Sequence, residues 1–129
     1  MLLLDTHTFI WLASDRTQLS EKVLALMEVE SDGLFISSIT ATEIGLLSIS
    51  GKINTYGSCK DFLFKNLKRF SIHEVPVDVE IAFASSQLPP IHRDPVDRII
   101  IATALVHGMV ILTKDRVIPT YPKVKVVWE

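Results

Sequence analysis

DPVDRIIIATALVHGMVILTKD, residues 94–115, combines the features that set the fold of this chain. Asp94 is a preferred helix N-cap residue, and Pro95 suits the first helical position, so a helix is predicted to begin here. The apolar run that follows is closed by Gly108, a typical C-terminal stop. The short apolar run Met109–Leu112 then has the pattern of a buried strand. This stretch therefore predicts a helix followed directly by a strand.

The same alternation of helical and strand patterns runs through the rest of the chain. Strands separated by helices are typical of an α/β fold with a central, mainly parallel sheet and helices on both faces. We expect a single domain over residues 1–129. The predicted strands cover residues 1–4, 34–36, 72–75, 109–112 and 125–127, and the predicted helices cover residues 8–13, 20–29, 38–50, 61–70, 79–88 and 94–107.

The composition indicates a folded globular protein. Apolar residues make up 48% of the chain and charged residues 22%, which is not a disordered composition. The apolar stretches are too short to span a bilayer and the N-terminal residues lack the basic flank of a signal peptide, so we expect a cytoplasmic protein without a membrane partner. The lone Cys59 excludes an internal disulfide, and the net charge of −2 provides no overall basic field for nucleic acid.

A few acidic residues stand in positions that a solvated surface does not explain. Asp5 and Asp115 each follow a predicted strand, which places them at the carboxyl end of a parallel sheet, where ligands bind in such folds. Glu43 lies on an apolar helical face without a capping duty, and Asp97 shares a face with apolar residues of its helix. A lone charge is rarely buried without a partner. For Asp94 two interpretations stay open, a helix N-cap or a part of a metal site.

Carboxylates that converge on one crevice repel one another. At about 4 Å and an effective dielectric constant of about 20, a like-charged pair costs about 4 kcal/mol before relaxation. Proton uptake relieves the repulsion by raising a pKa, and a divalent cation relieves it better. Hard oxygen ligands favour Mg²⁺ or Mn²⁺ over zinc, and His73, His92 and His107 show no ligand spacing. A bound metal would also allow a negatively charged chain to act on phosphate.

Four short motifs, taken in order, resemble those of PIN-domain ribonucleases. They are LLLDTH with Asp5, SSITATEI with Glu43, DPVDRIIIATAL with Asp97, and LTKD with Asp115. The set is similar, more narrowly, to the VapC-like toxins of bacterial type II toxin–antitoxin pairs, and it covers nearly the whole chain. Each motif alone is common, whereas all four in this order form a specific signal.

The resemblance implies an Mg²⁺- or Mn²⁺-dependent endoribonuclease that hydrolyses RNA phosphodiester bonds. It also implies inhibition by a cognate antitoxin and a homodimer. Three acids would bind one metal ion, and Asp115 would bind a second ion or a water. The implied catalytic and metal-binding residues are Asp5, Glu43, Asp97 and Asp115, with Asp94 as a secondary metal ligand and Thr6 and Thr113 as supporting hydroxyl groups.

Basic residues beside the acids are candidates for contacts with substrate phosphates. Arg98 is one of them, and Lys114 is another. Arg98 has further possible roles, because it can bind a carboxylate of an antitoxin or pair with Asp94 one helical turn earlier. The sequence does not decide among these roles.

Other function classes also stay open from the sequence. A haloacid-dehalogenase-like phosphatase begins with an apolar strand and an Asp, but it needs a second acid two residues later, where this chain has His7. A receiver-like module would use Asp5 and Lys114 but does not require Glu43 on an apolar helical face. A catalytically inactive PIN-like protein would keep the fold and only bind a partner.

Overall fold

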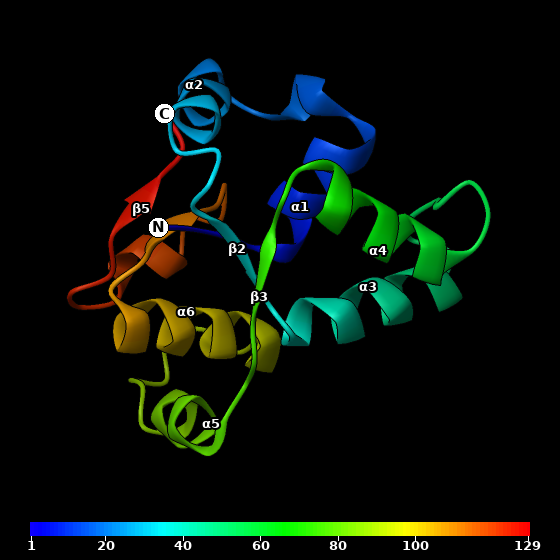
Figure 1. Ribbon diagram of the computed structural model, residues 1–129. Helices are drawn as coiled ribbons and strands as arrows, with labels where there is room; N and C mark the ends of the chain where they lie inside the picture. Colours follow the sequence, from blue (N-terminus) through cyan, green and yellow to red (C-terminus); the bar gives the residue numbers. More distant parts are fainter.

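The computed structural model describes residues 1–129 and contains a five-stranded sheet with helices on both faces (Figure 1). All strand pairs are parallel, so the predicted α/β fold is confirmed. Every predicted helix and strand is present, with ends that differ by one or two residues, and two short 3₁₀ helices were not predicted. The elements are β1 (Leu2–Leu4), α1 (Thr6–Ser14), η1 (Arg16–Gln18), α2 (Glu21–Val29), β2 (Leu34–Ser37), α3 (Ile39–Ile49), α4 (Cys59–Arg69), β3 (His73–Val75), α5 (Val79–Ser86), α6 (Pro95–His107), β4 (Val110–Leu112), η2 (Ile118–Thr120) and β5 (Val126–Val127).

The strand order places a switch point beside the first strand. The sheet has the order β3-β2-β1-β4-β5, so the chain moves outward from β1 to β3 and then returns to the opposite side of β1. At this reversal Leu4 of β1 lies opposite Leu112 of β4. In open parallel sheets, ligands bind beyond the carboxyl ends of the strands at such a point. The residues that follow Leu4 and Leu112 therefore occupy the ligand-binding end of the sheet.

Each face of the sheet has its own apolar core. Side chains alternate along a strand, so Leu2 and Leu4 pack with α1 to α4, whereas Leu3 packs with α5 and α6. The same alternation places Leu112 in the first core and Ile111 in the second. In Figure 1, α5 and α6 accordingly lie below the sheet, and α1, α2 and α4 lie above it. A strand that is buried on both faces appears in the sequence as an unbroken apolar run.

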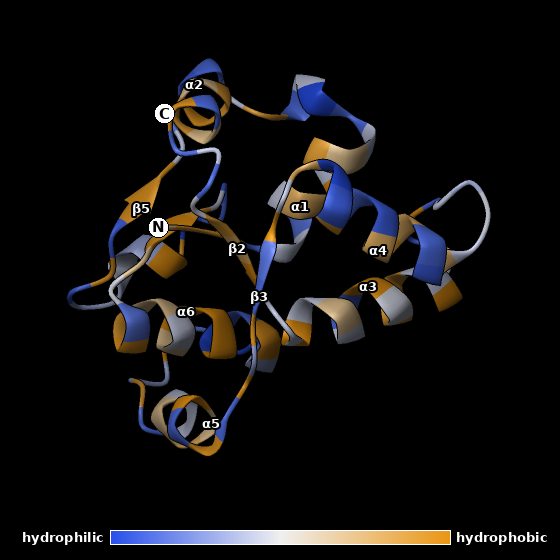
Figure 2. Ribbon diagram, in the orientation of Figure 1, coloured by the Kyte–Doolittle hydropathy of each residue, from blue (hydrophilic) through white to orange (hydrophobic).

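The helices follow the signals that were read from the sequence. Ser20 caps α2 through its hydroxyl oxygen, which accepts the Val23 N–H at 3.1 Å. Gly108 ends α6 with a φ of 67°, a left-handed conformation that glycine adopts without strain. Figure 2 shows that α4 carries both hydrophilic and hydrophobic residues, as expected for an amphipathic helix. None of the helices has the length and apolar character that a membrane crossing requires.

A buried hydroxyl group ties the first helix to the carboxyl end of β4. The Thr8 hydroxyl donates to the Leu112 carbonyl at 2.8 Å, and the Asp5 N–H donates to the same carbonyl at 3.3 Å. Thr8 is fully buried. These bonds hold the ends of β1 and β4 side by side and thereby fix where the following residues lie.

The Thr8→Val variant should lower the free energy of unfolding by about 1–2 kcal/mol, because it removes a buried hydrogen bond without changing the side-chain shape. Urea titration followed by circular dichroism measures the effect. Thr42→Val is the control, since Thr42 is exposed on α3 and should tolerate the same change. A Thr8→Val protein as stable as the wild type would contradict this role for the hydroxyl group.

Candidate active site

Asp5 lies directly beyond β1 and is held on both carboxylate oxygens. Its Oδ1 accepts the Thr8 N–H at 2.9 Å, which makes Asp5 the N-cap of α1. Its Oδ2 accepts the hydroxyl group of Thr113, the residue that follows β4. Only 7% of Asp5 is exposed. The structure thus places Thr113 against a carboxylate, in the way that was expected of this hydroxyl group.

Asp97 lies in the first turn of α6, and its environment opposes ionisation. The pKa of Asp97 is raised from its ordinary value of 3.8 to about 7, chiefly by burial, then by the charge of Asp94 and, to a smaller extent, by those of Asp5 and Glu43. His92 acts in the opposite direction but does not cancel these effects. The same influences indicate that these acids lie within electrostatic reach of Asp97.

Glu43 is the acid that α3 contributes near the site. It is half-buried on α3, a helix that packs against both α1 and α6. Its charge acts on Asp97, as does the charge of Asp5. The structure therefore brings together acids from the end of β1, from α3 and from α6, although these residues are far apart in the sequence.

The structure supports the capping interpretation of Asp94. Its Oδ1 accepts the Val96 N–H at 2.9 Å, with Pro95 at the start of α6. The charge of Asp94 still raises the pKa of Asp97. Asp94 therefore has a structural role that needs no metal.

Asp115 lies beyond β4 and is surrounded by donors. Its Oδ1 accepts the N–H groups of Val117 at 2.6 Å and of Ile118 at 3.3 Å, at the start of η2. Its Oδ2 lies 2.9 Å from His92 Nε2. Burial works to raise the pKa of Asp115, but the hydrogen bonds from His92 and the two N–H groups outweigh it, so the pKa is lowered. Asp115 is therefore an ionised and well-compensated neighbour of Asp97.

His92 belongs to the site, although its position in the sequence gave no sign of it. Its Nε2 lies 2.9 Å from Asp115 Oδ2 and 3.1 Å from Asp97 Oδ2. One ligand-type atom from each of the three residues lies within 4.8 Å of the others. The histidines show no metal-ligand spacing in the sequence, and His92 was not predicted to lie beside the acids. The contact arises because the loop before α6 folds over the end of β4. The spacing of residues in the sequence does not predict this loop conformation.

Thr6 is not placed as expected. Its side chain is buried, and its hydroxyl group lies 3.4 Å from the Thr40 hydroxyl group, in a contact between α1 and α3. It makes no hydrogen bond to a carboxylate. Thr6 therefore contributes to the packing of the two helices beside the site.

Arg98 also differs from the expectation. It forms no ion pair with Asp94, and its guanidinium group instead reaches the end of α5. The carbonyl groups that accept from it, at 2.9 to 3.0 Å, are those of Ser85, Leu88 and Pro89. Of the roles that the sequence left open for Arg98, pairing with Asp94 is not formed. Arg98 instead binds carbonyl groups at the carboxyl end of α5 and in the loop that follows this helix, and so fixes that loop.

Asp5, Asp97 and Asp115 border a cleft of about 360 Å³. One basic side chain lines it, that of Lys114, whose Nζ lies 5.9 Å from the centroid of the Trp11 ring. The cleft thus combines carboxylates with a cation and aromatic surface. The full set of lining residues is Asp5, His7, Trp11, Asp97, Lys114 and Asp115.

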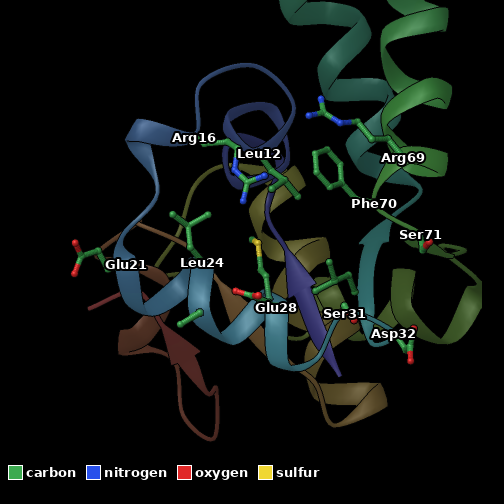
Figure 3. Close-up of a pocket in the computed structure, with 13 residues that line it drawn as sticks. Leu12, Arg16, Glu21, Leu24, Glu28, Ser31, Asp32, Arg69, Phe70 and Ser71 are labelled. Atoms are coloured by element: carbon green, nitrogen blue, oxygen red, sulfur yellow. The ribbon is translucent and has the colours of Figure 1, made fainter.

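A larger cavity of about 700 Å³ lies elsewhere in the molecule. It includes Leu34 at the start of β2 and Ser71 shortly before β3, so it is near the amino ends of these strands. Figure 3 shows Leu12 and Leu24 within it and the carboxylate of Asp32 at its margin. Size alone does not identify a site, and the convergent polar groups of the smaller cleft make that cleft the better candidate.

The donor set of the smaller cleft fits a hard divalent cation. Carboxylate oxygens are the preferred ligands of Mg²⁺ and Mn²⁺. Asp5 and Asp97 supply such oxygens from the cleft itself, and Glu43 on α3 lies within electrostatic reach of Asp97. The raised pKa of Asp97 reflects a repulsion that a cation would relieve.

In metal-free protein, the Asp97→Asn variant should become progressively more stable than the wild type as the pH rises from 4 to 8. The folded-state pKa of Asp97 is raised, so the wild type loses stability as the pH rises towards about 7, and asparagine does not titrate. We expect a gain of about 1–2 kcal/mol at pH 8, less than the full shift implies because the side chain keeps some contact with solvent.

Thermal and urea unfolding in EDTA measure this difference. The control is Asp61→Asn, because Asp61 also lies in the first turn of a helix but is exposed. If the difference in the free energy of unfolding between Asp97→Asn and the wild type were the same at pH 4 and pH 8, the proposed repulsion would be refuted.

Comparison with known proteins identifies the family to which the chain belongs. A model of the PIN domain family matches residues 2–124. Ribonuclease VapC22 of Mycobacterium tuberculosis is 28% identical over 130 residues, which cover 98% of each chain. A chain in the crystal structure of VapBC2 from Rickettsia felis, bound to a DNA fragment from their promoter, has a TM-score of 0.73 at 15% identity and covers 99% of this chain and 98% of that chain. A chain of a toxin–antitoxin complex from Klebsiella pneumoniae has a TM-score of 0.67 at 20% identity, with coverage of 98% and 96%. Because the family match spans nearly the whole chain, the protein belongs to the PIN domain family.

Proposed function

We propose that this protein is an endoribonuclease that hydrolyses RNA phosphodiester bonds with the help of Mg²⁺ or Mn²⁺. The observation that carries the proposal is that Asp5 and Asp97 line one cleft at the switch point of the sheet, with Glu43 close enough for its charge to raise the pKa of Asp97. Membership of the PIN domain family supports it, and so does the likeness to a relative that is named a ribonuclease.

In this proposal Asp5, Glu43 and Asp97 would hold the cation. When bound, the cation supplies positive charge that stabilises negative charge on the phosphoryl oxygens during attack. Asp5 offers a carboxylate whose orientation is fixed by Thr8 and Thr113 before any ligand arrives. A carboxylate of the cluster accepts the proton of the attacking water.

Contacts with the substrate would come from the walls of the cleft. Lys114 is exposed and lines the cleft beside the acids, so it is placed to bind a phosphate of the RNA backbone. Arg98 is not available for this role, because its guanidinium group is bound by backbone carbonyls. Local charge at the cleft therefore matters more for RNA binding than the net charge of −2.

We also propose that the protein works in the cytoplasm as a homodimeric toxin that a cognate antitoxin inhibits. This proposal is supported by the fold, which the protein shares with chains of solved complexes. One of these is a toxin–antitoxin complex. Co-purification with the product of a neighbouring gene and analytical ultracentrifugation are suitable measurements.

Cleavage of total RNA tests the catalytic proposal. Wild-type protein should cleave RNA in Mg²⁺ or Mn²⁺, lose this activity in EDTA and regain it when metal is restored. Asp97→Asn and Glu43→Gln should each reduce the rate by at least about 100-fold, because each removes a charged metal ligand. The controls are Asp61→Asn and Glu80→Gln, which change exposed acids near the starts of α4 and α5. Undiminished cleavage by Asp97→Asn would remove Asp97 from the mechanism.

The Asp94→Asn variant separates the two roles that the sequence left open for Asp94. Asparagine is as good an N-cap as aspartate, so a residue that only caps α6 should tolerate the change in both stability and cleavage rate. A cleavage rate reduced as strongly as that of Asp97→Asn, with stability unchanged, would show that Asp94 is a metal ligand. RNA cleavage and thermal unfolding of the same preparation provide both readouts.

The remaining function classes give different results in the same assays. A catalytically inactive binding protein would not cleave RNA with any metal. A phosphatase or receiver-like protein would form an acyl phosphate on Asp5, which trapping with hydroxylamine and mass spectrometry would detect. The absence of RNA cleavage together with an acyl phosphate on Asp5 would replace the nuclease proposal.

A further inference from the structure

His92 faces two carboxylates with a single ring nitrogen. Its Nε2 lies 2.9 Å from Asp115 Oδ2 and 3.1 Å from Asp97 Oδ2, and 14% of its side chain is exposed. We propose that His92 is a positioning residue that bridges Asp97 and Asp115 through one N–H group and so takes the place of a second metal ion. The inference rests on the proposed function and deepens it, because it limits the site to one cation.

The tautomer of His92 follows from its other ring nitrogen. The Asp94 N–H donates to His92 Nδ1 at 3.1 Å. A backbone amide can only donate, so Nδ1 must present its lone pair, and the proton of the neutral ring is then on Nε2. His92 therefore donates towards the two acids. The spacing of the three groups resembles a metal site, but in this tautomer Nε2 has no lone pair for a metal.

The ring is held in this orientation by the loop and by its surroundings. The backbone N–H of His92 donates to the Tyr121 hydroxyl group at 2.7 Å. Arg98 lies 3.4 Å from the same hydroxyl group and also binds the carbonyl of Pro89 at 2.9 Å. These contacts fix the loop from both sides, so the proposed bridge does not depend on a mobile side chain.

Asp115 has no oxygen left without a donor. Its Oδ1 accepts the N–H groups of Val117 and Ile118, and its Oδ2 faces His92. A cation shared by Asp97 and Asp115 would have to displace His92 from between them. A cation at Asp5 and Glu43 would not compete with His92, because His92 contacts neither of these residues and faces only Oδ2 of Asp97. In this proposal the hydrogen-bonded bridge takes the place of the second ion, one of the two ligands, ion or water, that the sequence suggested for Asp115.

Two substitutions separate the bridge from the support of the loop. In His92→Gln, the side-chain amide nitrogen can occupy the place of Nε2 and keeps a donor for the two acids. In His92→Asn, the side-chain oxygen can still accept the Asp94 N–H, but the shorter side chain does not reach Asp97 or Asp115. His107→Asn is the matched control, since His107 is exposed at the end of α6.

Mn²⁺ binding, measured by equilibrium dialysis with electron paramagnetic resonance of the free ion, tests the proposal on folded protein. We expect one Mn²⁺ per chain for the wild type, His92→Gln and His107→Asn, and a second Mn²⁺ for His92→Asn. Two ions on the wild type, or one ion on every variant, would overturn the role of His92 but leave the proposed nuclease intact. No Mn²⁺ on any of these proteins would overturn both.

A second measurement needs no variant and therefore does not depend on the folding of His92→Asn. Long-range ¹⁵N–¹H correlation spectra of the wild type at pH 8, with and without Mg²⁺, report which ring nitrogen of His92 carries the proton. The bridge requires a proton on Nε2 alone in both spectra. Any other protonation pattern in the Mg²⁺-loaded protein would overturn the inference.

Discussion

The hydrogen bonds of the Asp5 carboxylate fix the geometry on which the rest of the site depends. One oxygen is bound by the first turn of α1 and the other by Thr113 at the end of β4. The Leu112 carbonyl accepts from both Asp5 and Thr8, which joins the same segments through the backbone. A carboxylate that is fixed in this way cannot turn away when other acids approach it. The position of Asp5 is thus settled by the folding of β1 against β4, before any ligand is considered.

The other acids of the site are compensated to very different degrees. The Asp94 carboxylate accepts a hydrogen bond from the first turn of α6. The Asp115 carboxylate accepts one from the start of η2 and also faces His92. The Asp97 carboxylate faces only one compensating group, His92, which it shares with Asp115. Burial and the neighbouring acids disfavour its ionised form. The effect of burial and of neighbouring charges is therefore seen in the raised pKa of Asp97. This uneven distribution is what separates a site for a cation from a surface cluster of solvated acids.

The sequence predicts those features that depend on local pattern, and it misses those that depend on how loops fold back. Strands buried on both faces and helix ends such as Gly108 leave clear local signals, and the α/β fold follows from their order. The proximity of the acids that follow β1 and β4 could then be predicted as well, because parallel strands end at the same edge of the sheet. His92 and Arg98 leave no such signal. His92 reaches Asp115 from a loop, and Arg98 turns to the end of α5, although it lies next to Asp97 in the sequence.

The fold itself offsets much of the electrostatic repulsion among these acids, because most of the donors to their carboxylates are backbone N–H groups at helix starts. Asp5 and Asp94 cap α1 and α6, and Asp115 accepts two N–H groups at the start of η2, so three of the acids contribute to folding as well as to the electrostatics of the cleft. Asp97 and Glu43 have no capping duty of this kind. These two residues lie on helices that pack on opposite faces of the sheet. A cation between them and Asp5 would therefore link both layers of the fold, which connects metal binding at the cleft to the stability of the whole protein.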